Sequence, residues 1–222
     1  MIFFDLDDTL LDYKTSQDVA ARAFALRYPQ YIENAENFVT EWDVITEREM
    51  MRYVRGEIAF QQQRRNRIRS ALGLTLSDKE ADALFGEYYV VYEECWQLFP
   101  EVPDVLDELL SEPLGIITNG DGEHQRYKLE KLGILSRFTH VLSPGDAGVA
   151  KPSPVIFHLA AQRASRRASE CWYVGDNYHA DYQGALASGF KSVWLNRYGS
   201  KEECDEQCMD LREFLARFRA AR

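Results

Sequence analysis

The sequence is poor in cysteine and has no long apolar run. Its four cysteines, Cys95, Cys171, Cys204 and Cys208, form no CxxC pair and have no histidines at ligand spacing. This spacing indicates neither a zinc site nor a disulfide framework. No uncharged apolar run approaches the roughly 18 residues of a membrane-spanning helix, and the N-terminal segment lacks the pattern of a secretory signal. We therefore expect a soluble, cytoplasmic protein with no membrane partner.

Positive charge is also in short supply. Lysine and arginine total 26 against 36 aspartates and glutamates, which gives a net charge of −10. A phosphate backbone would repel such a chain unless a local basic patch prevailed, so a nucleic acid polymer is not an expected partner. Apolar residues make up 45% of the 222 positions, enough for a sizeable core. The length predicts either one large α/β unit or a core with an insertion.

The order of apolar and helical patterns favours a core with an insertion. Residues 2–5 are a short apolar run that ends in an acidic cluster, as in a buried strand, but no second strand arrives within the roughly 30 residues of a βαβ unit. Helical patterns follow instead, and only later do short apolar runs alternate with helices, as in a parallel sheet. We predict a doubly wound parallel, Rossmann-like α/β core with an inserted helical cap. The core would comprise residues 1–13 and 98–222, and the cap residues 14–97.

Individual elements follow from strand runs and helix signals. The expected strands are 2–5, 114–118, 138–142, 171–174 and 192–195. The expected cap helices are 15–28, 33–54, 57–72 and 77–96. The expected core helices are 103–110, one that ends near 131, 153–164, 180–188 and 209–219.

Polar residues that could bind a ligand or take part in catalysis follow these strands directly or closely. In a doubly wound sheet, ligands bind beyond the carboxyl ends of the strands, so these residues should meet at one place. Carboxylates that converge there repel one another unless a cation is present, and oxygen ligands of this kind suit Mg²⁺. Together with a lysine, they would let a phosphate group approach a carboxylate, which predicts phosphoryl transfer. The segments are Asp5-Leu6-Asp7-Asp8-Thr9, Thr118-Asn119-Gly120, Lys151-Pro152, and Gly175-Asp176-Asn177 with Asp181 one helical turn further on.

Taken in order, these segments resemble the four motifs of the haloacid dehalogenase-like hydrolase superfamily. The resemblance covers both parts of the predicted core, and the insertion is similar to the C1-type cap of subfamily I. No catalytic position departs from the pattern, and the one variation is Asp8, where many members have glycine. The sequence of residues 115–120 and 148–152 resembles that of the branch of this superfamily that includes pyrimidine 5′-nucleotidases.

The resemblance implies that Asp5 is the nucleophile and Asp7 the acid and base. Asp5 would form an aspartyl phosphate, while Asp7 would protonate the leaving alcohol and then deprotonate the water that attacks the intermediate. The backbone carbonyl of Asp7 would also reach Mg²⁺. An alkoxide leaving group needs a proton whereas a halide does not, so Asp7 favours ester hydrolysis over dehalogenation.

Roles for the other motif residues follow from the same resemblance. Thr118 and the backbone amide of Asn119 would hold the transferring phosphate. Lys151 would neutralise the nucleophile and the phosphate. Asp176 would bind the metal directly, and the other protein ligands would be the Asp5 carboxylate and the backbone carbonyl of Asp7. Asp181 would orient Lys151 or a metal-bound water.

We therefore predict a Mg²⁺-dependent phosphomonoesterase that acts on a small phosphorylated metabolite, with a nucleoside 5′-monophosphate favoured. A phosphoglycolate or sugar phosphatase is the next alternative. A phosphotransferase, a phosphomutase or a 2-haloacid dehalogenase would use the same core, and a non-catalytic binding protein is a further alternative that the intact motifs disfavour. The pattern leaves a monomer and a homodimer equally open.

Overall fold

The computed structural model describes residues 1–202 and 204–221, and the chain divides into two compact units. One unit comprises Met1–Asp12 and Gln97–Arg222, and the other comprises Tyr13–Trp96. Positions 203 and 222, which the sequence analysis assigned to the core, lie outside the described residues. Within the described part of the chain, no helix combines the length and the apolar character needed to cross a membrane.

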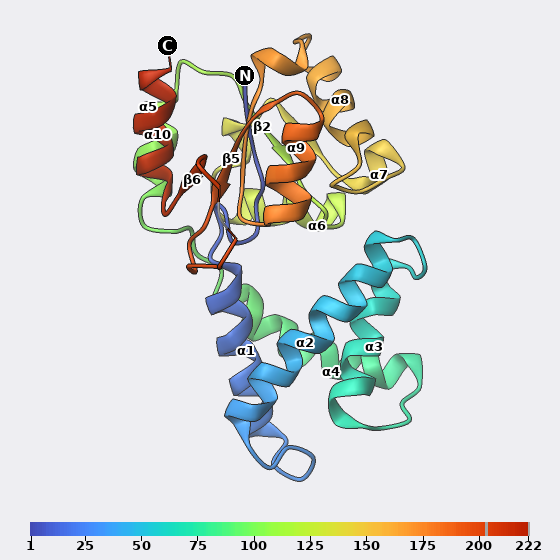
Figure 1. Cartoon of the computed structure of the whole chain (residues 1–222). Helices are drawn as coiled ribbons and strands as arrows, with labels where there is room; N and C mark the ends of the chain where they lie inside the picture. Colours follow the sequence, from blue (N-terminus) through green and yellow to red (C-terminus); the bar gives the residue numbers. More distant parts are fainter. Residues whose placement is uncertain (203, 222) are drawn as a thin grey trace. The chain divides into compact units, whose positions relative to one another are not determined.

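A six-stranded parallel sheet forms the centre of the larger unit, and Figure 1 labels its strands β2, β5 and β6. The order of the strands is β3-β2-β1-β4-β5-β6. Each described pairing is parallel. The strand order reverses at β1, so the carboxyl ends of β1, β2 and β4 lie next to one another at the switch point where such sheets bind ligands. The prediction of a doubly wound parallel sheet is confirmed. The strands are β1 (Ile2–Phe4), β2 (Leu114–Ile117), β3 (His140–Leu142), β4 (Trp172–Gly175), β5 (Lys191–Leu195) and β6 (Gln207–Cys208).

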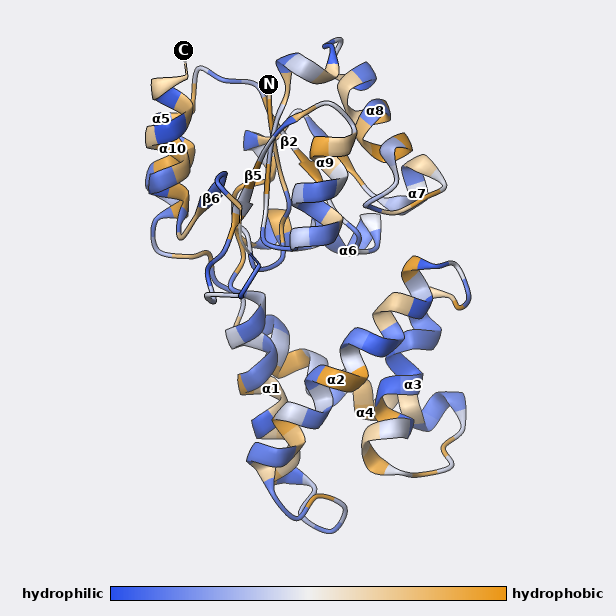
Figure 2. Ribbon diagram, viewed as in Figure 1, coloured by the Kyte–Doolittle hydropathy of each residue, from blue (hydrophilic) through white to orange (hydrophobic). Residues whose placement is uncertain are grey.

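Helices bury both faces of the sheet. Successive strand residues point to opposite faces, so Phe3 lies in a buried cluster with Phe157 of α8, whereas Phe4 meets Phe214 of α10 at a ring-centroid distance of 5.9 Å. Because both faces are buried, the strands are continuous apolar runs. By contrast, α10 carries both apolar and polar residues, as Figure 2 shows. The helices of this unit are α5 (Val102–Glu108), α6 (Gly122–Lys131), α7 (Pro144–Ala147), α8 (Pro154–Arg163), α9 (Gly184–Ala187) and α10 (Leu211–Ala220).

The second unit is a bundle of the helices α1 (Tyr13–Arg27), α2 (Ala35–Val54), α3 (Phe60–Leu72) and α4 (Asp78–Glu94). Each helix packs against the next, and α1 packs against α4. Local signals define the ends of α4 and α3: Ser77 and Glu80 form a capping box, and Gly73 ends α3 with a φ of 63°. Trp42 and Tyr88, both buried, meet at 4.6 Å in the core of the bundle.

Several elements differ from the sequence-based expectation. The helix expected at 180–188 starts earlier, as a π-helical turn Tyr178–Gln183 that leads into α9. The Asn177 side chain starts it by accepting hydrogen bonds from the backbone N–H groups of His179 and Ala180. Short 3₁₀ turns, Leu135–Arg137 and Ala168–Glu170, precede β3 and β4. β6 and α7 were not expected from the sequence, because β6 has two residues and α7 has four, and neither contains an apolar run.

Candidate active site

Three carboxylates meet at the carboxyl ends of β1 and β4. Asp5 follows β1, Asp176 follows β4, and Asp181 lies in the π-helical turn beyond it. One ligand oxygen from each residue lies within 4.8 Å of the other two. The structure thus brings together Asp5 and Asp176, which were expected to share an ion, and adds Asp181. Among the described residues, the Asp7 carboxylate is not part of this cluster.

Lys151 provides the positive charge of this cluster. Its side chain is only 3% exposed, and its Nζ donates to Asp5 Oδ1 at 2.7 Å and to Asp181 Oδ1 at 2.6 Å. It also donates to the carbonyl oxygen of Ile117. The Asn119 side chain holds the lysine backbone: its Oδ1 accepts from Lys151 N–H at 2.8 Å and its Nδ2 donates to Lys151 O at 3.0 Å. The second and third motifs are thereby joined directly.

Asp181 is fixed by hydrogen bonds to both of its oxygens. Besides Lys151, Oδ1 accepts a hydrogen bond from the Tyr173 hydroxyl at 2.9 Å, and Oδ2 accepts one from the backbone N–H of Asn177 at 2.9 Å. The carboxylate lies so close to Gly175 that a Cβ there would be 2.4 Å from Asp181 Oδ2. Glycine is therefore required at the end of β4 for Asp181 to reach Lys151.

The electrostatics of the cluster favour a bound cation. Burial raises the pKa of Asp5 to about 7, although Lys151 opposes the shift. Burial, together with Asp181 and Asp5, raises the pKa of Asp176 well above its ordinary value. Burial alone would lower the pKa of Lys151, but Asp181 and Asp5 outweigh it and raise that pKa. Three carboxylates thus share one ammonium group, and their hard oxygen donors fit Mg²⁺.

Magnesium is expected to stabilise the protein more at about pH 8 than at about pH 5.5. Below the Asp5 pKa of about 7, the cation must displace a proton, so its affinity falls as the pH falls through that value. At a Mg²⁺ concentration of about 100 times Kd, the free energy of unfolding should rise by about 2.7 kcal/mol. Thermal melts with and without Mg²⁺ at both pH values measure this effect. Equal shifts at the two pH values, or none at pH 8, would contradict it.

The turn after β1 is held by hydrogen bonds from two residues that follow β5. Arg197 Nη2 donates to the carbonyl oxygen of Thr9 at 2.8 Å, and the Tyr198 hydroxyl donates to Asp8 Oδ1 at 2.9 Å. Thr9 Oγ1 in turn donates to Asp176 Oδ1 at 3.3 Å. Asp8 has a φ of 56°, a left-handed conformation that glycine adopts freely and aspartate tolerates. The variation at Asp8 therefore keeps the shape of the turn.

Two polar partners of the first and second motifs were not expected from the sequence. Lys128 Nζ donates to Asp7 Oδ1 at 2.6 Å, and Gln125 Nε2 donates both to Asp7 Oδ2 at 2.9 Å and to Thr118 Oγ1 at 2.8 Å. Both residues come from α6, whose start directly follows the segment Thr118-Asn119-Gly120. Their spacing of three residues was the available signal, because it places a glutamine and a lysine on one helix face.

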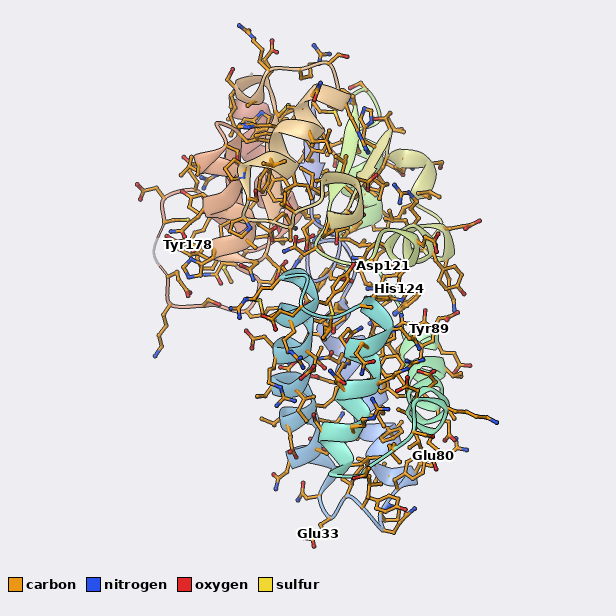
Figure 3. The ribbon with its side chains drawn as sticks, turned by 90° about the vertical axis from the view of Figure 1, so that its right-hand side faces the viewer. Glu33, Glu80, Tyr89, Asp121, His124 and Tyr178 are labelled. Atoms are coloured by element: carbon orange, nitrogen blue, oxygen red, sulfur yellow. The ribbon has the colours of Figure 1, made fainter. Side chains whose placement is uncertain are left out.

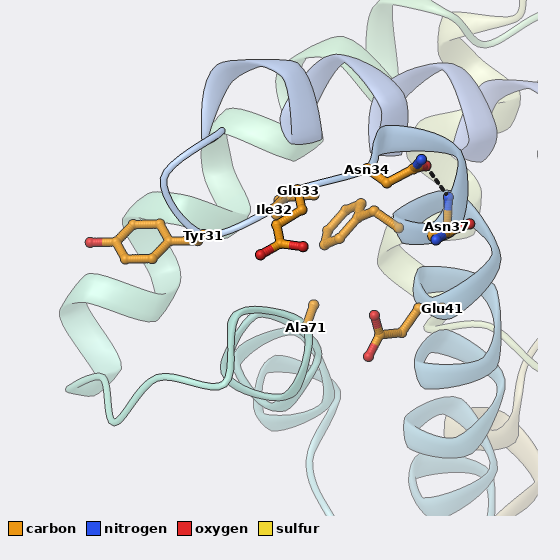
Figure 4. A pocket seen from close by; sticks show the side chains of 8 residues that line it. Tyr31, Ile32, Glu33, Asn34, Asn37, Glu41 and Ala71 are labelled. Atoms are coloured by element: carbon orange, nitrogen blue, oxygen red, sulfur yellow. Dashed lines mark hydrogen bonds between the residues drawn. The ribbon is translucent and has the colours of Figure 1, made fainter.

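A pocket in the helical unit does not compete with this site. It has a volume of about 210 Å³, below the roughly 300–1,000 Å³ of typical small-molecule sites. Figure 4 shows the carboxylates of Glu33 and Glu41 at its rim, with Asn34 accepting a hydrogen bond from the backbone N–H of Asn37. It offers no cation to an anionic substrate. Its lining residues are Tyr31, Ile32, Glu33, Asn34, Asn37, Phe38, Glu41 and Ala71.

Comparison with known sequences gives a consistent result. The family model for haloacid dehalogenase-like hydrolases matches residues 1–189. The chain is 36% identical over 200 residues to the ribulose-1,5-bisphosphate 5-phosphatase of Halopiger xanaduensis, covering 86% of this chain and 82% of that protein. It is 32% identical over 217 residues to the phosphoglycolate phosphatase of Shigella boydii, covering 89% and 81%.

Solved structures share the whole fold. YfnB from Bacillus subtilis, solved with bound magnesium, superposes with a TM-score of 0.84 at 22% identity, covering 98% of this chain and 97% of that one. A 2-haloacid dehalogenase from Pseudomonas syringae pv. Tomato superposes with a TM-score of 0.67 at 30% identity, covering 98% of each chain. The inserted helical unit is part of both matches, because they span nearly the entire sequence.

Proposed function

The chain belongs to the haloacid dehalogenase-like hydrolase family and is a phosphatase, and we propose that it hydrolyses a small phosphorylated metabolite through a phosphoryl group carried by Asp5. The observation that carries this proposal is the environment of Asp5. Its carboxylate lies at the end of β1, is paired with the buried Lys151, and shares a cluster of oxygen ligands with Asp176 and Asp181. An anionic nucleophile that attacks an anionic phosphate needs such an arrangement.

The proposed reaction has two steps. In the first, Asp5 Oδ bonds to phosphorus while the bond from phosphorus to the substrate oxygen breaks, and Asp7 gives that oxygen a proton. In the second, water attacks phosphorus, Asp7 takes up a proton of the water, and the bond to Asp5 breaks. Inorganic phosphate leaves and both carboxyl groups return to their starting states. Thr118 and the backbone amide of Asn119 would hold the phosphate oxygens.

We propose Mg²⁺ as the cofactor, held by Asp5 and Asp176 with the backbone carbonyl of Asp7. The bound ion would offset the negative charges of the phosphate and the carboxylates. Asp181 would hold Lys151 in place, since its Oδ1 accepts a hydrogen bond from Lys151 Nζ at 2.6 Å. The helical unit, residues 14–97 in the sequence-based assignment, is proposed as the cap that selects the substrate.

A phosphorylated sugar or hydroxy acid is the substrate class that the relatives support. Their names specify ribulose-1,5-bisphosphate and phosphoglycolate, which are small anionic metabolites of this kind. The nucleoside 5′-monophosphate favoured by the sequence patterns has no support from these relatives and becomes a second class to be tested. Both classes are monoesters of an alcohol and therefore need the proton that Asp7 would deliver.

Dehalogenation is the second candidate, because a 2-haloacid dehalogenase shares the fold at 30% identity. A halide leaves without a proton, so that reaction has no use for an acid two residues after the nucleophile. Asp7 is nevertheless engaged by two buried side chains, Lys128 and Gln125. Because two buried donors hold the Asp7 carboxylate in place, the structure favours a reaction that uses Asp7, which is ester hydrolysis.

A panel of phosphate esters tests the proposed function. Sugar phosphates, phosphoglycolate and nucleoside 5′-monophosphates are assayed for inorganic phosphate, and 2-chloropropionate is assayed for chloride. We expect phosphate release with Mg²⁺ and no acceptor alcohol, loss of that activity in excess chelator, and no chloride. Chloride release, full activity in chelator, or phosphate transfer only to an added alcohol would each overturn the proposal.

A further inference from the structure

One face of α6 carries two buried polar side chains. Gln125 and Lys128 are three residues apart, and each is at most 2% exposed. Asp121 is the N-cap residue of this helix, and its side chain accepts a hydrogen bond from the backbone N–H of His124 at 3.1 Å (Figure 3 labels both). A lysine buried this deeply needs an anionic or strongly polar partner, so its contacts indicate what the face serves.

That partner is the carboxylate of Asp7. Lys128 donates to one oxygen at 2.6 Å and Gln125 donates to the other at 2.9 Å. The Asp7 side chain is still 29% exposed, so it stays open toward solvent while its orientation is fixed from behind. Two donors from one rigid helix restrict the carboxylate far more than a single flexible contact would.

Gln125 also sets the direction of the Thr118 hydroxyl. Thr118 Oγ1 accepts from Gln125 Nε2 at 2.8 Å and from the backbone N–H of Gly120 at 3.1 Å. A hydroxyl has two lone pairs and one proton, so this oxygen accepts twice and keeps its proton to donate. Gly120 makes the approach possible, because a Cβ there would lie 2.6 Å from Gln125 Cδ.

We propose that Lys128 and Gln125 are positioning residues, which hold the Asp7 carboxylate at the leaving-group oxygen and leave the Thr118 proton free for the phosphate. This inference rests on the proposed phosphatase function and extends it to two residues outside the four motifs. Neither residue touches the substrate in this scheme. Each acts through the group that it orients.

The expected signature is dependence on the leaving group. A well-placed general acid contributes about 10²- to 10⁴-fold for an alkyl phosphate, whereas 4-nitrophenyl phosphate has a leaving group that needs no proton. Replacing Lys128 with methionine removes one of two donors, so kcat/KM should fall by roughly 10- to 100-fold for the alkyl ester and by roughly threefold or less for the aryl ester. The ratio kcat/KM reports phosphorylation of the enzyme and is insensitive to the later hydrolysis step.

A double-mutant cycle with Asp7→Asn separates positioning from general structural damage. In the Asp7→Asn background, Lys128→Met should change kcat/KM for the alkyl ester by less than about twofold, because the acid that it positions is already gone. Lys131→Met, at an exposed lysine of the same helix, is the matched control and should match the parent. Equal losses on both esters, or an undiminished loss in the Asp7→Asn background, would overturn the inference.

A variant that fails to fold and a parent that is inactive can each be told apart from a failure of the positioning role. If Lys128→Met shows no cooperative thermal melt, the same cycle is run with Lys128→Gln, which keeps a donor and removes the charge. If the parent protein releases no phosphate from either ester, the proposed function fails; if the parent is active and the cycle is additive, only the positioning role fails.

Discussion

Replacing Asp5 with asparagine is expected to lower kcat/KM on every phosphate ester by about 10⁴-fold or more. An amide oxygen is a poor nucleophile, and the change also removes a negative ligand oxygen from the cluster with Asp176 and Asp181. Asparagine has the same shape as aspartate, so packing at the end of β1 is kept. Steady-state assays with Mg²⁺ measure this loss.

The folded state should survive the Asp5→Asn change. Lys151 keeps Asp181, the Tyr173 hydroxyl and the carbonyl oxygen of Ile117 as partners. Without metal, the change also removes one of three crowded carboxylates, so the melting temperature should be equal to or above that of the parent. An Asp5→Asn protein that melts like the parent yet retains more than about 1% of the activity would contradict the nucleophile assignment.

Replacing Lys151 with methionine should damage both activity and stability. The change removes the cation that pairs with Asp5 and with Asp181, which is 1% exposed. Removing one partner of a buried ion pair typically costs about 3–5 kcal/mol, because the other charge stays buried without compensation. Loss of a preorganised positive group at the transferring phosphate should lower kcat by roughly 10²- to 10³-fold.

Urea unfolding of metal-free protein measures the stability loss, and kinetics with Mg²⁺ measure the loss of activity. Lys131→Met removes an exposed lysine by the same substitution and should change the free energy of unfolding by less than about 0.5 kcal/mol. Added Mg²⁺ should restore part of the stability of Lys151→Met, because it supplies positive charge to the same carboxylates, but not the activity. An unchanged free energy of unfolding would show that the ion pairs of Lys151 contribute little.

The sequence was sufficient to place the main residues of the candidate site. Asp5, Asp176 and Thr118 each follow a strand, and β1, β4 and β2 are neighbours, so a prediction of the parallel sheet already brought these side chains to one edge. Lys151 is further from its strand, and its arrival at Asp5 depends on the Asn119 side chain that holds its backbone. The order of the motifs predicted that Lys151 would meet Asp5, but it did not show how the backbone of Lys151 is held.

The remaining partners could not be predicted because they depend on tertiary packing. Tyr173 lies inside β4, where an apolar run indicates burial but not that its hydroxyl meets Lys151 and Asp181. Lys128 looks like an ordinary surface residue in sequence, and only the packing of α6 beside the first-motif turn turns it toward Asp7. Asp7 lies 118 and 121 positions from Gln125 and Lys128, so the sequence places these two residues on one helix face but does not show which group that face contacts.

The most direct measurement is to quench the enzyme with acid during turnover of a good substrate with Mg²⁺ and to locate the phosphoryl group by peptide mass spectrometry. We predict an acid-stable acyl phosphate on Asp5, formed in a burst that approaches one per active site and absent from Asp5→Asn. A phosphoryl group on any other side chain, or an acyl phosphate that still forms in Asp5→Asn, would contradict covalent catalysis by this residue.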